Sequence, residues 1–81
     1  MTTAPARPLH EIAREISMDW GLKINYAAQP YLNAMAALNE ITDMYGYDSA
    51  EEIVLRFLGN ATSWRGETAR RVKAELRAMI K

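Results

Sequence analysis

The chain has 81 residues, 49 % of them hydrophobic and 25 % charged, with one histidine and no cysteine. Such a chain forms one small folded domain rather than a disordered segment, and its residue types exclude thiol chemistry and cysteine-bound zinc and argue against a histidine-based metal site. The formal net charge is zero, but residues 1–64 carry four basic and eight acidic side chains, whereas residues 65–81 carry six basic and two acidic ones, so the C-terminal segment has a positive field of its own.

The N-terminal third of the chain predicts a tail, a helix and a connector. The first seven residues are polar and include a proline, which predicts a flexible tail over 1–7. From Pro8 onward, apolar residues recur at helical spacing until Gly21, so we expect a first helix over about 8–20. Residues 22–29 begin with strand-like alternation, but no second strand is predicted to pair with them. We interpret them as a buried connector.

Three further helices follow. Pro30 suits the first turn of a second helix, which the apolar spacing extends to about Tyr45. Gly46 can adopt the left-handed conformation that ends a helix, and Ser49 followed by Glu52 is a capping-box pattern that places the start of a third helix near Ala50. Residues 59–60 weaken the end of this helix. A fourth helix begins within 63–67, and its inward positions are Ala69, Val72, Leu76, Met79 and Ile80.

Four amphipathic helices with short loops and no credible strand pair predict an all-α fold, a small bundle of four short helices. One helical domain would then span residues 8–81. Most aromatic residues lie on or beside the apolar stripes, which favours the core over a platform for stacking nucleic-acid bases. Tyr47 is the exception, because it lies at a turn between Gly46 and Asp48.

Residues that suggest catalysis or metal binding have simpler explanations. His10 lies on the polar side of the first helix without an adjacent nucleophile, and the serines fit helix caps and surface positions. The acidic group around the second turn does not follow the ligand spacing of a calcium loop, and carboxylates there suit the start of a helix. This group comprises Glu40, Asp43, Asp48, Glu51 and Glu52. We predict no catalytic residue, no bound metal and no cofactor.

The last helix carries the clearest candidate for a binding surface. Its cations form one stripe on the predicted exposed side, flanked by Arg71, and such a face suits phosphates or an acidic protein surface. The alternative is a solvated face whose cations offset the helix dipole and pair with Glu67. Arg65, next to Trp64, could instead bind an acidic residue of the second or third helix. The candidate partner-binding residues are Arg65, Arg70, Lys73, Arg77, Lys81 and Tyr47.

Three segments carry a resemblance to a known family: HEIAREI, PYLNAMAALNEITDMYGYDSA and NATSWRGETARRVKAEL. With them the chain resembles, from about residue 9 to residue 80, a family of short, mostly uncharacterised proteins of bacteriophages and prophages of Gram-positive bacteria, including actinobacterial phages. The resemblance implies a non-structural phage accessory protein that acts in the bacterial cytoplasm. It implies no reaction and no catalytic residue.

Two functions remain open at this point. The first is a non-catalytic accessory protein that binds a host or phage protein and, by analogy, modulates a host enzyme or defence system. The second is a nucleic-acid-binding protein that uses the basic face of the last helix. The neutral net charge and the scarcity of base-reading side chains on that helix argue against it. The lack of cysteine, of a signal peptide and of an apolar run near the roughly 20 residues of a membrane span predicts a cytoplasmic protein without a membrane partner.

Overall fold

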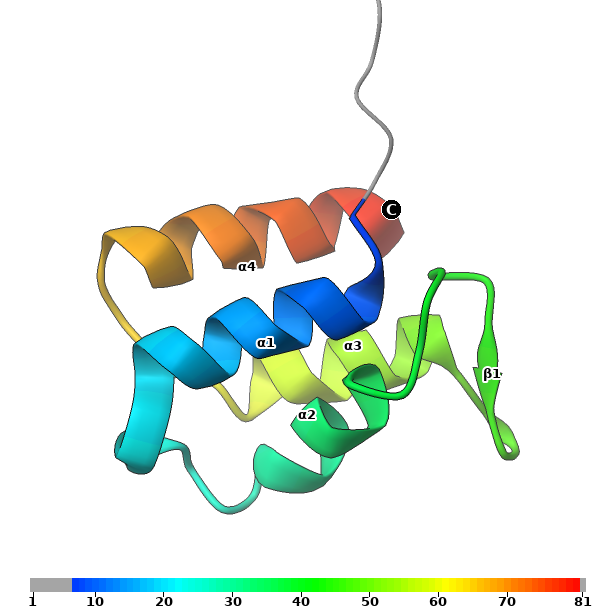
Figure 1. Ribbon diagram of the computed structural model, residues 1–81, viewed down its shortest axis with the longest axis horizontal. Coiled ribbons are helices and arrows are strands. Elements are labelled where there is room, and N and C mark those ends of the chain that lie inside the picture. The colour runs from blue at the N-terminus through cyan, green and yellow to red at the C-terminus, as the bar shows by residue number, and fades with distance from the viewer. Residues whose placement is uncertain (1–6, 81) are drawn as a thin grey trace, which may run out of the picture.

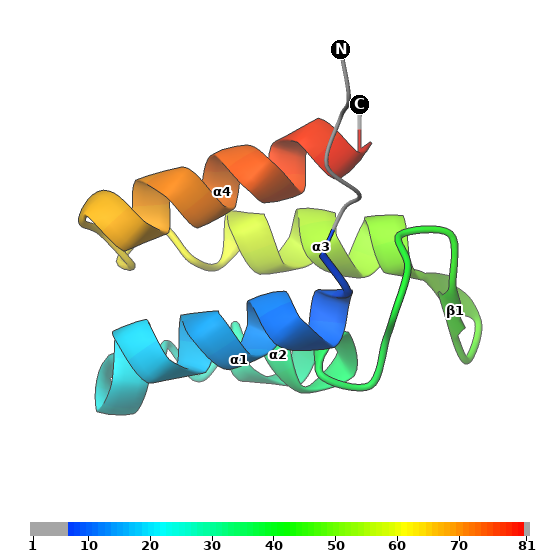
Figure 2. The ribbon, with the colours of Figure 1, turned by 45° about the horizontal axis from the view of Figure 1, so that its top comes forward.

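The computed structural model describes residues 7–80, and within this range the chain is mostly helical (Figure 1). Its elements, in chain order, are α1 (Leu9–Trp20), the 3-10 helix η1 (Gly21–Lys23), α2 (Gln29–Met35), β1 (Met44–Tyr45), β2 (Asp48–Ser49), α3 (Ala50–Gly59) and α4 (Glu67–Ile80). Helices α1 and α3 each contact both α2 and α4. Helix α4 runs antiparallel to α1 and α3 (Figures 1 and 2). The predicted four helices are therefore confirmed, but the exclusion of a strand pair is wrong.

The core lies between the four helices, and three aromatic rings pack together in it where α1 ends. Trp20 of α1 stacks on Trp64 with 5.7 Å between ring centroids, and Phe57 of α3 meets both rings edge-on at 6.2 and 6.4 Å. Trp64 is 2 % exposed, and its indole Nε1 donates a 2.8 Å hydrogen bond to the carboxylate of Asp19. The expected position of Trp64 at the joint before the last helix is confirmed. Its ring joins α1, α3 and the segment that leads into α4.

Helix α1 has the predicted extent to within one residue. Gly21 ends it with a φ of +62°, a left-handed conformation that glycine adopts without the steric cost a side chain would bring. At the other end, Pro8 supplies no side-chain cap. The backbone N–H groups of Leu9 and His10 instead donate to the carbonyls of Asn39 and Leu38, at 2.8 and 3.0 Å. The chain that leaves α2 therefore caps the start of α1.

The connector between α1 and α2 is more exposed than expected. Leu22 is fully exposed and Tyr26 is 88 % exposed, while Ile24 is half-buried against the core. The 3-10 turn of η1 removes the strand-like alternation, so these apolar residues do not share one inward face. The prediction of a buried connector is therefore wrong for Leu22 and Tyr26.

The second helix is shorter than predicted, and a small hairpin follows it. After Met35 the chain tightens into turns, and the Asp43 carboxylate accepts hydrogen bonds from the backbone N–H groups of Asn39 and Glu40. Such side-chain acceptors compete with the helical ladder. Strands β1 and β2 then pair antiparallel, with Met44 opposite Ser49 and Tyr45 opposite Asp48. Gly46, with a φ of +65°, makes the turn between them.

The start of α3 is confirmed in detail. The Ser49 hydroxyl oxygen accepts a 3.1 Å hydrogen bond from the backbone N–H of Glu52, as an N-cap should. The reciprocal half of the predicted capping box is not formed. The Glu52 carboxylate instead pairs with Arg56 one turn later, at 2.9 Å. Helix α4 begins at Glu67, inside the predicted window. Over residues 7–80, no helix combines the length and the apolar character that a bilayer crossing requires.

Candidate functional site

The predicted basic stripe forms one wall of a groove beside the first turns of α4. The groove has a volume of about 320 Å³ and carries four cations: Arg65, Arg70, Lys73 and Arg77. Trp64, Gly66 and Ala69 also line it. We call this site the basic groove. Lys81, the last residue predicted for the stripe, lies outside the described residues.

The spacing of α4 explains why these residues meet. Positions 66, 69, 70, 73 and 77 fall on one side of a helix with 3.6 residues per turn. Gly66 and Ala69 have little or no side chain, so they leave open the space that longer residues would fill. Arg65 reaches the same groove from the segment before the helix. The sequence indicates the cations, but it does not indicate that small residues between them make the surface concave.

The four cations of the groove have no acidic partner among residues 7–80. The ion pairs of this part of the chain join Arg7, Arg56 and Arg71 to Glu15, Glu52 and Glu75. No carboxylate lines the groove. The expected alternative for Arg65, a pair with an acid of the second or third helix, is therefore not formed. The positive charge of the groove remains available to an anionic partner.

Lys73 differs from the other cations. Its ammonium group donates hydrogen bonds to the carbonyls of Ala61 and Trp64, at 2.8 and 2.7 Å, and lies 5.8 Å from the centre of the Trp64 ring. Partial burial lowers the pKa of Lys73, and the positive charges of Arg77 and Arg65 lower it further. The prediction that Lys73 lies free on an exposed stripe is wrong, because it ties α4 to the loop after α3. Arg70 and Arg77 are exposed, as expected.

Arg71 belongs to a separate cluster of charges, on the side of α4 that faces α1. The Arg7 guanidinium holds the Glu75 carboxylate through two hydrogen bonds, at 2.9 and 2.7 Å, and also binds Glu15 at 2.8 Å. Arg71 pairs with Glu15 rather than with Glu67. Arg7, predicted as part of the flexible tail, is therefore bound to the helices, whereas residues 1–6 of that tail lie outside the described residues.

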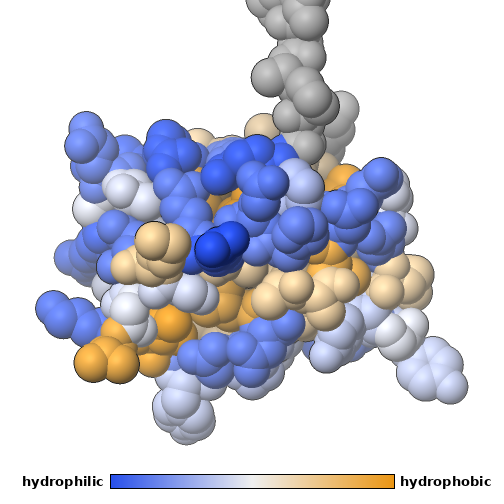
Figure 3. Space-filling view, viewed as in Figure 1, coloured by the Kyte–Doolittle hydropathy of each residue, from blue (hydrophilic) through white to orange (hydrophobic). Residues whose placement is uncertain are grey.

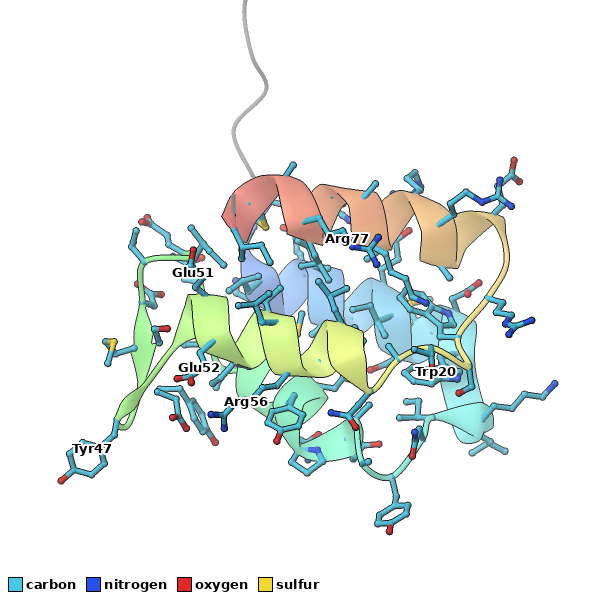
Figure 4. The ribbon with its side chains drawn as sticks, turned by 180° about the vertical axis from the view of Figure 1, so that it is seen from behind. Trp20, Tyr47, Glu51, Glu52, Arg56 and Arg77 are labelled. Atoms are coloured by element: carbon cyan, nitrogen blue, oxygen red, sulfur yellow. The ribbon has the colours of Figure 1, made fainter. Side chains whose placement is uncertain are left out.

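The hairpin carries the other predicted site residue. Tyr47 is fully exposed (102 %) and points away from the body of the protein (Figure 4). Its exposed neighbours are Met44 and Tyr45 of β1, and the half-buried Asp48 follows it in β2, whereas Glu51 points to another side of the molecule, where Ile41 and Ile80 lie (Figure 4). We call Met44, Tyr45, Tyr47 and Asp48 the hairpin tip. The expectation that Tyr47 lies outside the core is confirmed. The expected core positions of Tyr26 and Tyr45 are wrong, since both are exposed.

The other acidic residues around the hairpin serve the fold. Asp43 closes the turn after α2, and Glu52 pairs with Arg56, whose pKa it raises. Within residues 7–80 no group of three or more histidine, cysteine or acidic residues is placed to hold a metal ion.

A wider hollow of about 540 Å³ beside α1 carries both signs of charge, from Glu11, Glu15, Asp19 and Arg14. It therefore selects neither anions nor cations, in contrast to the basic groove. Comparison of the chain with protein-family models, with curated proteins and with solved structures gives no match in any of the three.

Proposed function

We propose that this chain is a small non-catalytic phage accessory protein that binds a host or phage protein, and that the basic groove receives an acidic segment of that partner. The observation that carries the proposal is the set of four cations that line one groove without an internal acidic partner. The phage context rests on the resemblance of the three sequence segments described above.

An acidic protein segment fits the chemistry of the groove. Arginine guanidinium groups bind carboxylates through two parallel hydrogen bonds, and three of the four cations are arginines. Lys73 already donates two of its three N–H bonds to backbone carbonyls, so it contributes mainly charge. A carboxylate in the groove would offset the positive charges that now lower the pKa of Lys73.

The positions of the other polar residues support a non-catalytic role. His10 is exposed on α1, and Ser49 caps α3. Neither is placed beside the groove, whose polar side chains are all cations. Cations can hold and orient an anionic group, but at neutral pH arginine is a poor proton acceptor.

Nucleic acid is the second candidate, because phosphate is the other ligand that arginines favour. Two observations favour protein. The exposed positions of α4 are three arginines, two alanines and Glu67, which supply no amide or hydroxyl group to read base edges. Asp48, Glu51 and Glu52, in the hairpin and the first turn of α3 at the other end of the molecule, would repel a long polyanion that extended beyond the groove (Figure 1).

Binding of defined probes tests the proposal. Fluorescence anisotropy would compare a labelled glutamate-rich peptide with single- and double-stranded oligonucleotides. Arg70→Glu/Arg77→Glu should abolish peptide binding, whereas the control Arg14→Glu/Lys23→Glu, with the same change in charge on α1 and η1, should retain it. If the parent binds oligonucleotides with a steep salt dependence and does not bind the peptide, nucleic acid is the partner. If it binds neither probe, the groove is a solvated face.

A further inference from the structure

The side of α3 that adjoins α4 carries exposed apolar surface. Leu55 is 53 % exposed, and Leu58 is half-buried against the core. Residues three, four and seven positions apart lie on one side of a helix, so Leu55 and Leu58 share a side of α3 with Glu51. Glu51 lines a hollow of about 390 Å³ together with Met79 and Ile80 of α4, and this side of α3 therefore faces α4.

Two contacts place Leu55 level with Arg77 along the seam between the antiparallel helices α3 and α4. Glu51 marks one end of this seam, beside the last turn of α4, and the hydrogen bond from Lys73 to the Ala61 carbonyl marks the other. Leu55 and Arg77 each lie about one turn in from the Glu51 end. Arg77 projects from α4 toward α3 (Figure 4). Apolar surface on α3 thus runs beside the cations of the basic groove.

We infer that the acidic segment received by the basic groove is an amphipathic helix of the partner, with its acidic side against α4 and its apolar side against Leu55 and Leu58. The inference rests on the proposed function and specifies the partner's chemistry more closely. The cations of the groove call for carboxylates, whereas a purely acidic segment would leave Leu55 in water.

The dimensions of the seam fit a helix. Arg70 and Arg77 are two turns apart, or about 10.5 Å along α4, which is the separation of acidic residues at i and i+7 of a partner helix. An extended segment would instead need free backbone groups on this chain. The carbonyls of Ala61 and Trp64, beside the groove, already accept hydrogen bonds from Lys73.

Glu51 limits where the acidic residues of the partner can lie. It forms no ion pair within residues 7–80 and is located at the end of the seam beyond Arg77 (Figure 4). Its carboxylate would repel an acidic residue at that end. The carboxylates of the partner therefore face the stretch between Arg65 and Arg77, about three turns of helix long.

Other exposed apolar residues do not specify an occupant. Those of the hairpin tip project at one end of the molecule, and apolar side chains also reach the surface at the connector (Figure 3). The hollow beside α1 carries both signs of charge. Among the described residues, only the seam between α3 and α4 joins an exposed leucine to a groove of one charge.

Binding of designed peptides tests the inference. A patterned peptide of about 14 residues would carry glutamates at i and i+7 and leucines along the adjacent side of the helix. Fluorescence anisotropy would compare it with a scrambled peptide of the same composition and with the glutamate-rich peptide at equal net charge. The patterned peptide should bind about tenfold more tightly than either, because it alone buries apolar surface on the seam. A central proline should remove this advantage, since it breaks the helix.

Leu55→Ala separates the apolar contact from the charge. It should weaken binding of the patterned peptide by roughly threefold or more and leave binding of the glutamate-rich peptide unchanged, which also shows that the groove is still folded. The control Leu22→Ala removes a fully exposed leucine of the connector and should change neither affinity. Arg70→Glu/Arg77→Glu should abolish binding of both peptides.

Three results would overturn the inference. They are equal affinity for the patterned and scrambled peptides, a Leu55→Ala variant that binds the patterned peptide like the parent, and an advantage of the patterned peptide that survives the central proline. In each case the proposed function stands if the glutamate-rich peptide binds and Arg70→Glu/Arg77→Glu abolishes that binding. If no peptide binds, both proposals fall.

Discussion

At the scale of single residues, hydrogen bonds divide the cations of α4 into structural and available groups. Lys73 is held by two backbone carbonyls and Arg71 by Glu15, while Arg70 and Arg77 are exposed and unpaired within residues 7–80. Positions only three or four residues apart on one helix thus have different roles. The sequence places Lys73 and Arg70 on the same face, but it does not show that a loop carbonyl lies within reach of one of them.

Charge reversal at Lys73 should therefore affect folding. In Lys73→Glu, the carbonyls of Ala61 and Trp64 lose a charged donor, and such a loss costs roughly 1–3 kcal/mol of unfolding free energy. Arg70→Glu, at an exposed position one turn earlier, should stay within about 0.5 kcal/mol of the parent. Urea denaturation measures both. Equal stability of the two variants would mean that the Lys73 hydrogen bonds contribute nothing to the fold.

The cap at Ser49 gives a second prediction for a single side chain. Ser49→Ala removes the acceptor of the Glu52 backbone N–H at the start of α3 and should cost about 1 kcal/mol in the free energy of unfolding. Ser63→Ala is the control, since Ser63 lies exposed in the loop before α4. A loss of the same size at Ser63 would show that the effect at position 49 does not come from the cap.

At the scale of elements, the sequence predicts those helices whose ends are encoded locally. Gly21 ends α1 and Ser49 begins α3, and both act through their own backbone or side chain. Helix α2 ends before a turn that Asp43 closes, and the residues of that turn also make a tertiary contact. The carbonyls of Leu38 and Asn39 cap α1, a contact between segments about 30 residues apart that periodicity cannot reveal.

The candidate site, like the helices, is predictable from the sequence only in part. Helical spacing indicates which cations share a face of α4, and turn chemistry indicates that Tyr47 is exposed. The concavity of the groove depends on how the loop of residues 60–66 meets α4. Trp64 holds this loop in place, because its ring packs on Trp20 and its Nε1 donates a hydrogen bond to Asp19. These are tertiary contacts, so a single sequence without aligned relatives does not encode them in any short pattern.

The packing of the segment between α3 and α4 therefore depends on Trp64. Trp64→Ala removes a buried ring that contacts two other aromatic residues, and it should cost roughly 3–5 kcal/mol, enough to unfold much of a domain this small. The helical circular-dichroism signal and its thermal transition measure the loss. Tyr47→Ala removes an exposed aromatic ring and should leave the transition unchanged. A Trp64→Ala variant as stable as Tyr47→Ala would remove Trp64 from the core.

At the scale of the whole molecule, charge is separated into regions with different roles. Arg7, Glu15, Arg71 and Glu75 form a network that joins the start of the described chain to α1 and α4. The basic groove lies apart from it and contains cations that form no ion pair within residues 7–80. The four positive charges of the groove are offset by acidic side chains elsewhere in the chain, so a net charge of zero coexists with one strongly positive face.

The network predicts how stability depends on pH. Hydrogen bonds from Arg7 and then Arg71 lower the pKa of Glu15 below its ordinary value of 4.5, because both favour the ionised carboxylate. A depressed pKa in the folded state means that Glu15 contributes stability above pH 4.5, and that the contribution is lost as the pH falls through the folded pKa. Glu15→Gln should therefore be less stable than the parent at neutral pH, by up to about 1 kcal/mol for so exposed a network. The difference should shrink to zero in strong acid.

Urea denaturation between neutral pH and strong acid measures the difference in unfolding free energy. The control is Glu11→Gln, because Glu11 is an exposed α1 residue without an ion pair within residues 7–80. A Glu15→Gln deficit that stays constant down to strong acid would show that the variant loses packing rather than charge.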